Sequence, residues 1–154
     1  MSWNQLIKHC LKSSYTETID DHLWLRNEKT SLGSSPLHFA VIGGCMETIE
    51  LLTGCGNINS RNFFGETALH WASKEASSDV VLYLLGNGAR PNCVDYDGDS
   101  PLHWAAEYDR CDILSVLMKH GANPNQRNSE GETPLEVAKL NNSASCVALL
   151  ESIM

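Results

Sequence analysis

The sequence predicts an all-α solenoid, in which short helix-turn-helix units stack side by side and project loops or hairpins. Two markers recur along the 154 residues at a nearly constant period, with apolar residues at helical spacing between them. A turn with two short helices cannot bury its own apolar face, so such units must stack into one continuous core. The first marker is Gly33-Ser34-Ser35-Pro36-Leu37-His38-Phe39-Ala40, Gly65-Glu66-Thr67-Ala68-Leu69-His70-Trp71-Ala72, Gly98-Asp99-Ser100-Pro101-Leu102-His103-Trp104-Ala105 and Gly131-Glu132-Thr133-Pro134-Leu135-Glu136-Val137-Ala138, with glycines 32, 33 and 33 residues apart. The second is Gly56-Asn57-Ile58-Asn59, Gly88-Ala89-Arg90-Pro91-Asn92 and Gly121-Ala122-Asn123-Pro124-Asn125.

The first helix of each unit is expected to begin inside the first marker. Ser35, Thr67, Ser100 and Thr133 are suitable N-cap residues, because their side-chain oxygens can accept hydrogen bonds from free N–H groups of the first turn. In three units a proline follows, where its missing N–H costs nothing. Each helix is expected to end at a turn-prone stretch, and these stretches are residues 43–44, 76–78, 109–110 and 141–143.

The second helix of each unit has the spacing of one continuous apolar face. Its apolar residues are Met46, Ile49, Leu51 and Leu52, then Val80, Val81, Leu84 and Leu85, then Ile113, Leu114, Leu117 and Met118, and finally Val147, Leu149 and Leu150. Gly56, Gly88 and Gly121 lie where a residue with positive φ would end the helix. The polar segments that follow are predicted to project as loops or hairpins.

The two markers resemble the T-P-L-H box and the G-A-x-x-N segment of the ankyrin repeat, over about residues 27–152. Ala68 replaces the proline, Glu136 replaces the histidine, and an alanine is missing beside Gly56. The resemblance implies that the three remaining histidines bond around the Ser or Thr at the helix start and tie neighbouring repeats, a structural rather than a metal-binding role. These histidines are His38, His70 and His103. It also implies that the loop asparagines mainly hold turns, although an asparaginyl hydroxylase can modify them in this family. These asparagines are Asn59, Asn92 and Asn125.

A single ankyrin-repeat domain is expected over residues 1–154. Its predicted units are repeats at 28–60, 61–93 and 94–126, followed by a C-terminal capping repeat at 127–154. Residues 1–27 contain no T-P-L-H box, but Ser2 with Gln5 and Ser14 with Glu17 have capping-box spacing. This segment is interpreted as a degenerate N-terminal capping helix pair.

Net charge and hydropathy restrict the kinds of binding partner and the cellular locations that we expect for this protein. Eleven basic and nineteen acidic residues give 11 − 19 = −8, which disfavours nucleic acid or an anionic membrane as the main partner. The sequence contains no run of about 18 apolar residues, so it predicts no transmembrane helix. The first twelve residues do not resemble a secretory signal. We expect the protein to lie in the cytoplasm, or in both the cytoplasm and the nucleus. We also expect it to be a monomer in the absence of a partner.

The sequence predicts no catalytic residue, metal or cofactor. Six cysteines include no C-x-x-C pair and are interpreted as reduced thiols. Asp95-Tyr96-Asp97-Gly98-Asp99 begins like a calcium loop, but the glutamate expected six residues after the glycine is absent. One catalytic alternative stays open, a thiol- or metal-dependent activity that uses Cys93 or Cys111 and needs an abnormally reactive thiol.

Candidate binding residues follow from the ankyrin resemblance, which places partner contacts at the hairpin tips and the exposed ends of the first helices. Aromatic residues at solvent-facing tips are typical of interface hot spots, whereas folding of Phe63 or Phe64 back onto a neighbouring loop is an equally weighted alternative. Trp71 and Trp104 are interpreted as core residues. An acidic rim that includes Asp95 would steer a basic or mixed-charge partner. The candidate partner-binding residues are Leu32, Phe63, Phe64, Glu66, Lys74, Glu75, Tyr96, Asp97, Asp99, Glu107, Tyr108 and Glu130.

The function implied is that of a non-enzymatic protein–protein interaction module, an adaptor, scaffold or inhibitor that presents a rigid, acidic concave surface. Rigid presentation loses little ordering entropy on binding. Short arrays of this kind resemble inhibitor-of-NF-kappaB-like proteins and the ankyrin domains of adaptors. The alternative is a regulatory ankyrin segment of a larger signalling or membrane protein.

Overall fold

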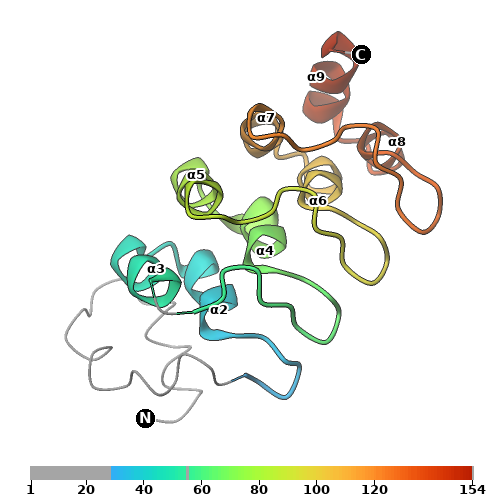
Figure 1. Cartoon of the computed structure of the whole chain (residues 1–154). Helices are drawn as coiled ribbons and strands as arrows, with labels where there is room; N and C mark the ends of the chain where they lie inside the picture. Colours follow the sequence, from blue (N-terminus) through green and yellow to red (C-terminus); the bar gives the residue numbers. More distant parts are fainter. Residues whose placement is uncertain (1–28, 55, 154) are drawn as a thin grey trace.

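The computed structural model describes residues 29–54 and 56–153, in which eight helices form two parallel rows (Figure 1). The predicted N-terminal cap at residues 1–27 lies outside the described residues. One row contains the first helix of each unit, namely α2 (Pro36–Gly43), α4 (Ala68–Glu75), α6 (Pro101–Glu107) and α8 (Pro134–Leu140). The other row contains the second helices, α3 (Met46–Thr53), α5 (Ser78–Gly86), α7 (Cys111–Lys119) and α9 (Ala144–Ile153). No strand occurs in this part of the chain, so the all-α solenoid is confirmed.

Each first helix begins at the predicted N-cap residue, which has an extended backbone. A capping box forms in all four, in which the N-cap side chain accepts from the backbone of the third helical residue and that residue's side chain accepts from the N-cap N–H. Histidine fills the third position in three repeats, and Glu136 fills it in the last. Because these signals lie within a few residues, the helix starts are fixed locally.

The three histidines also join consecutive repeats, as the ankyrin resemblance implies. His38 Nδ1 accepts from Ser35 N–H at 3.1 Å, and His38 Nε2 lies 3.0 Å from the carbonyl oxygen of Glu66 in the next repeat. His70 and His103 make the same pair of contacts, with the Nε2 to carbonyl distance at 3.0 and 3.1 Å. All three rings are buried, which confirms the structural role.

A glycine with positive φ was predicted after three of the second helices. The prediction is confirmed at two of these glycines and wrong at the third. Gly88 and Gly121 have φ of 95° and 90°. Gly56 is absent from the positive-φ glycines of the described chain, because α3 already ends at Thr53 and is followed by Gly54 with φ −62°. The loop after α3 lacks the alanine that Ala89 and Ala122 supply elsewhere, and Gly54 rather than Gly56 is the C-cap of this helix.

The core lies between the two rows and runs without interruption from α2 to α9. Alanines at one register of the first helices are fully buried, which lets these helices approach closely; they are Ala40, Ala72, Ala105 and Ala138. Buried leucines, isoleucines and valines of both rows fill the remaining volume. Each helix pair therefore buries its apolar face against its neighbours, as expected for a solenoid. None of the described helices has the length and apolar character needed to cross a membrane.

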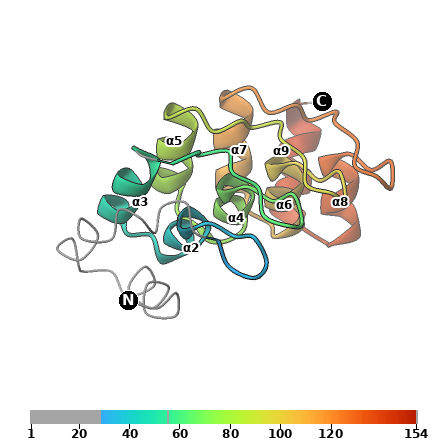
Figure 2. The same ribbon diagram turned by 60° about the horizontal axis from the view of Figure 1, so that its bottom comes forward.

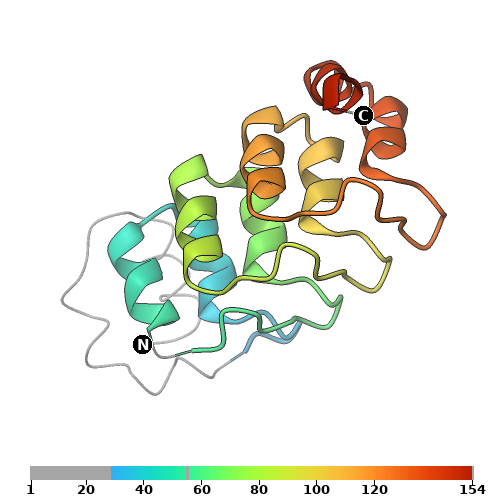
Figure 3. The ribbon, with the colours of Figure 1, turned by 45° about the horizontal axis from the view of Figure 1, so that its top comes forward.

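The segments between units project from the same side of the molecule, beside the row of first helices (Figure 3). Each is a short hairpin closed by backbone hydrogen bonds, such as Asn62 N–H to Glu66 O at 3.0 Å and Asp95 N–H to Asp99 O at 2.9 Å. Figure 2 shows these hairpins lying close to one another in chain order. The face formed by the hairpins and the first helices holds the candidate residues, and we call it the hairpin face.

Candidate protein-binding surface

The shape of each hairpin depends on an Asn or Asp at its base. Asn62 Oδ1 accepts hydrogen bonds from the backbone N–H groups of Phe64 and Glu66, both at 3.0 Å. Asp95 Oδ1 does the same for Asp97 and Asp99, at 3.0 and 2.9 Å, and Asn128 occupies the equivalent position. These side chains replace backbone partners in the turn.

The placement of Asp95 in an acidic rim was wrong. Its side chain is 8 % exposed, and while Oδ1 holds the hairpin, Oδ2 accepts from the indole N–H of Trp104 at 3.0 Å. A carboxylate engaged in this way organises the loop and offers little to a partner. The recurrence of Asn62 and Asn128 at the same register was a sequence signal for this role.

Successive hairpins are joined to each other near their tips. Phe63 N–H donates to Leu32 O, Tyr96 N–H to Phe64 O, and Ser129 N–H to Asp97 O, each at 2.9 Å. The first residue of each tip therefore lies over the preceding hairpin, where a glycine leaves room. The ring of Phe63 covers Gly33 and the ring of Tyr96 covers Gly65, since a Cβ at either glycine would come within 3.0 Å of the ring.

The tips of the first three hairpins nevertheless leave four apolar side chains exposed, and we call them the tip patch. Their exposed fractions are 55 % for Leu32, 67 % for Phe63, 53 % for Phe64 and 69 % for Tyr96. The alternative in which Phe63 folds back onto a neighbouring loop is confirmed, since its ring contacts Gly33. The rest of the ring faces solvent, and its role as an interface anchor stays a prediction. The guanidinium of Arg61 lies 5.8 Å from the centre of the Tyr96 ring.

A hollow of about 270 Å³ lies beside the hairpins and is lined by α2, α4 and α6. Glu66, Lys74 and Glu75 lie here as predicted site residues, together with Ile42, Trp71 and Trp104. We call it the central hollow. Tyr108 lies at its edge, with the ammonium of Lys74 4.8 Å from the centre of its ring.

Trp71 packs against the core, and both tryptophans line this surface, so their interpretation as core residues alone was incomplete. Trp71 packs edge-on against His38 at 5.2 Å and donates its indole N–H to Glu66 Oε2 at 2.8 Å. Trp104 packs against His70 in the same way. Neither ring is fully buried, and both line the central hollow. Their residue type favours burial, and only the packing of adjacent repeats shows which ring edge stays accessible.

A second hollow, of about 290 Å³, lies between the last two hairpins and α8, and we call it the acidic hollow. Five carboxylates line it, together with polar residues and Val137, and no Lys or Arg does so. The five are Asp97, Asp99, Glu107, Glu130 and Glu132. Burial raises the pKa of Asp99 and of Glu107, and the charge of Asp99 raises the pKa of Glu107 further.

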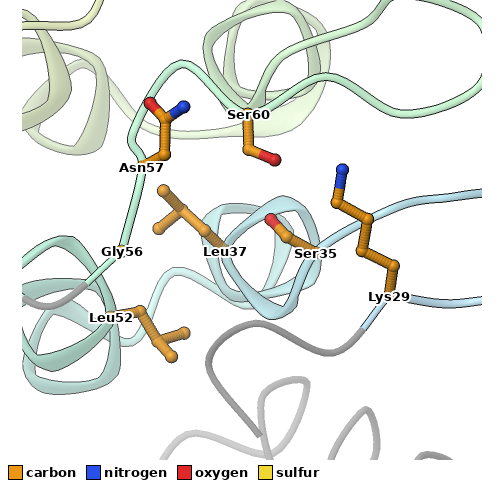
Figure 4. Close-up of a pocket in the computed structure, with 7 residues that line it drawn as sticks. All are labelled: Lys29, Ser35, Leu37, Leu52, Gly56, Asn57 and Ser60. Atoms are coloured by element: carbon orange, nitrogen blue, oxygen red, sulfur yellow. The ribbon is translucent and has the colours of Figure 1, made fainter.

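A smaller hollow of about 70 Å³ lies at the other end of the described stack (Figure 4). It is lined by Lys29, Ser35, Leu37, Leu52, Gly56, Asn57 and Ser60. None of the twelve predicted site residues takes part in it. The predicted residues therefore fall into the tip patch, the central hollow with its edge, and the acidic hollow, all on the hairpin face.

The cysteines of the described chain are dispersed. Cys93 and Cys111 are partly buried, whereas Cys45 and Cys146 are buried. Burial raises the pKa of Cys146 to about 12, and the nearby charge of Asp109 adds to the effect, so this thiol stays protonated at neutral pH. Within residues 29–54 and 56–153, no group of three or more His, Cys, Asp or Glu side chains is arranged to hold a metal ion.

Two of the three loop asparagines hold turns as expected. Asn59 donates from Nδ2 to Gly88 O and accepts at Oδ1 from Arg90 N–H, both at 2.9 Å. Asn92 makes the corresponding contacts one repeat later. Asn125 differs, because it donates its backbone N–H to Asn123 Oδ1. Asn59 and Asn92 thus join consecutive repeats, each through the backbone that follows the second helix of the next repeat.

Comparison with known families agrees with this arrangement. The family profile described as ankyrin repeats (3 copies) matches residues 6–95 and 79–152, which together span nearly the whole chain. The chain belongs to the ankyrin-repeat family. Ankyrin repeats are protein–protein interaction modules and form a non-catalytic fold. The hairpin face of this ankyrin-repeat protein is therefore a candidate surface for a protein partner.

Proposed function

We propose that this ankyrin-repeat chain is a non-enzymatic adaptor, scaffold or inhibitor that binds a protein partner on a rigid, acidic concave surface. The surface is the hairpin face, which carries the twelve candidate residues. We further propose that the chain acts as a monomer in the cytoplasm or nucleus, on a partner of basic or mixed charge. Binding would occupy, bridge or mask that partner.

The tip patch is the observation that carries this proposal. Its four apolar side chains are more than half exposed, although their backbone is fixed by hydrogen bonds between hairpins. Exposed aromatic rings on a rigid frame gain free energy only when something covers them, which is how interface anchors behave. Carboxylates beside them favour a basic or mixed-charge partner by steering its approach.

Affinity capture from native lysate tests the proposal. The test protein is the Phe63→Ala, Phe64→Ala, Tyr96→Ala variant, here called the tip variant. A matched control, Leu82→Ala with Ile153→Ala, removes exposed apolar side chains from the outer helices α5 and α9. We expect a captured protein that the wild type and the control retain and the tip variant loses, with all three proteins folded by circular dichroism.

An unchanged set of captured proteins in the tip variant would contradict the proposed site. Salt dependence adds a kinetic check. Electrostatic steering predicts that the association rate of the captured partner falls as ionic strength rises, because salt screens exposed charges beyond about 8–10 Å. A rate that does not depend on salt would show that the acidic residues do not guide binding.

A further inference from the structure

The tip patch and the acidic hollow meet within one hairpin. Tyr96 belongs to the patch, and Asp97, the next residue, lines the hollow. Asp97 O accepts from Ser129 N–H, so the next tip continues the same surface without a break. Along the hairpin face, the tip patch thus lies toward α2 and the acidic hollow lies toward α8. The two regions are adjacent along the stack, and Glu66, Lys74 and Glu75 of the central hollow lie beside them.

The five carboxylates of the acidic hollow take no part in the ion pairs that the structure gives. The four pairs among described residues are Lys74–Glu75, Arg110–Asp112, Arg127–Glu136 and Lys139–Glu151. Asn128 Nδ2 donates to Asp99 Oδ1 at 2.9 Å, which satisfies one oxygen but adds no positive charge. The hollow therefore concentrates negative charge that an external cation would stabilise.

We propose that the tip patch and the acidic hollow bind one segment of a partner protein, whose apolar side chains cover the patch and whose arginine side chain enters the hollow. This inference rests on the proposed function and specifies its ligand. It also fixes a direction, because the apolar part of the segment must lie toward α2 and the basic part toward α8.

Charge complementarity selects this occupant over others. A wholly apolar segment would cover the patch but leave the five carboxylates without a cation, and a wholly basic segment would leave four exposed apolar side chains uncovered. Arginine fits the hollow better than lysine because its planar group presents five N–H donors that can bridge several carboxylates. The occupant is thus a segment with separate apolar and basic blocks.

A random-peptide display library, selected on immobilised full-length protein, provides the probe. The decisive variant is Asp97→Asn with Glu130→Gln, because these side chains make no hydrogen bond given by the structure and their loss should not unfold the hairpins. The matched control, Glu50→Gln with Asp79→Asn, removes the same charge from exposed sites on α3 and α5. We expect the wild type and the control to select peptides with an apolar block and an arginine-containing block.

The Asp97→Asn, Glu130→Gln variant should bind a selected peptide about tenfold more weakly, equivalent to about 1.4 kcal/mol. Replacing the peptide arginine by glutamine should have a similar effect on the wild type but little further effect on the variant, since both changes remove one contact. Strictly additive losses would overturn the placement of arginine in the hollow.

Two further outcomes also overturn this inference. If the selected peptides need the tip patch but carry no basic block, this inference is wrong and the proposed function still stands. A selection that yields no peptide sensitive to the tip variant would also overturn this inference, and the lysate capture would then decide the proposed function separately.

Discussion

His70 Nε2 lies 3.0 Å from the carbonyl oxygen of Asp99, which is 29 residues further along the chain and directly precedes the N-cap residue of α6 in the next repeat. On the other side of the ring, Nδ1 accepts from Thr67 N–H at 3.1 Å. Because a backbone N–H only donates and a carbonyl only accepts, the imidazole is neutral with its proton on Nε2. A proton on Nδ1 would break the bond at the helix start.

The buried histidine predicts a loss of stability on mild acidification. Burial lowers the pKa of His70 from 6.5 to about 4, so the unfolded chain takes up the proton first. The stabilisation is complete above pH 6.5 and is lost as the pH falls toward 4. We expect His70 to contribute a loss of about 2 kcal/mol between pH 8 and pH 5.

The measurement is urea unfolding across this pH range for the wild type and for His70→Gln, since glutamine suits a capping box but does not titrate. The stability of the wild type relative to the variant should fall as the solution is acidified. A constant difference from pH 8 to pH 5 would mean that His70 does not stay neutral in the folded protein.

The helix starts and the histidine bridges were predictable because their signals are local and repeated. Ser35, a following proline and His38 lie within four residues, and the same pattern recurs with little change. The prediction for Gly56 was wrong because α3 ends at Thr53 with Gly54 as its C-cap, so Gly56 does not close this helix.

The candidate site was only partly predictable, because a residue type does not say which atoms are already engaged. Asp95 and Asp97 are both acidic and two residues apart, yet Asp95 holds the turn and Asp97 lines a hollow. Trp71 and Trp104 were assigned to the core by size and apolarity, whereas the spacing between repeats leaves one edge accessible. The role of Asp95 arises from contacts within its own repeat, with the backbone of Asp97 and the indole of Trp104. The accessible edges of the tryptophans, in contrast, arise from the packing of adjacent repeats, which a single repeat does not contain.

The last repeat predicts a second loss of folding stability, at a lower pH than the loss caused by His70. Glu136 Oε2 accepts from Thr133 N–H at 2.6 Å and from Thr133 Oγ1 at 2.9 Å, and these hydrogen bonds lower the pKa of Glu136. The stabilisation is present above the ordinary pKa of 4.5 and is lost as the pH falls through the lower pKa of the folded state. Glu136→Gln should lower Tm at pH 7 and make no difference at pH 2, and an equal effect at both pH values would contradict it.

Arg110 connects two repeats through backbone carbonyls. Its Nη1 donates to Lys74 O at 2.8 Å and its Nη2 to Ala76 O at 2.6 Å, at the C-terminal end of α4. Arg110→Met keeps the apolar stem but removes both charge-assisted bonds, so we expect a loss of about 1–3 kcal/mol in urea unfolding. Arg90→Met, at an exposed site, should cost less than about 0.5 kcal/mol. Similar losses for both would show that the bonds of Arg110 are not stabilising.

The contact between hairpin tips can be separated from the cost of a left-handed backbone. Gly98 and Gly131 have nearly equal φ, 81° and 82°. A Cβ at Gly98 would lie 2.7 Å from Ser129 N, whereas a Cβ at Gly131 would meet nothing within 4 Å. Alanine at either site incurs the backbone strain of about 1–2 kcal/mol, but only at Gly98 does it also displace the N–H that donates to Asp97 O.

We therefore expect Gly98→Ala to lower the free energy of unfolding by at least about 1 kcal/mol more than Gly131→Ala does, measured by urea unfolding followed by circular dichroism. The excess reports the packing of one hairpin on the next, since the strain common to both variants cancels. Equal losses of unfolding free energy would mean that the hairpin tips can move apart without destabilising the protein. The tip patch and the acidic hollow would then not be held in a fixed relative position, and a rigid hairpin face would be the wrong description of how this protein meets a partner.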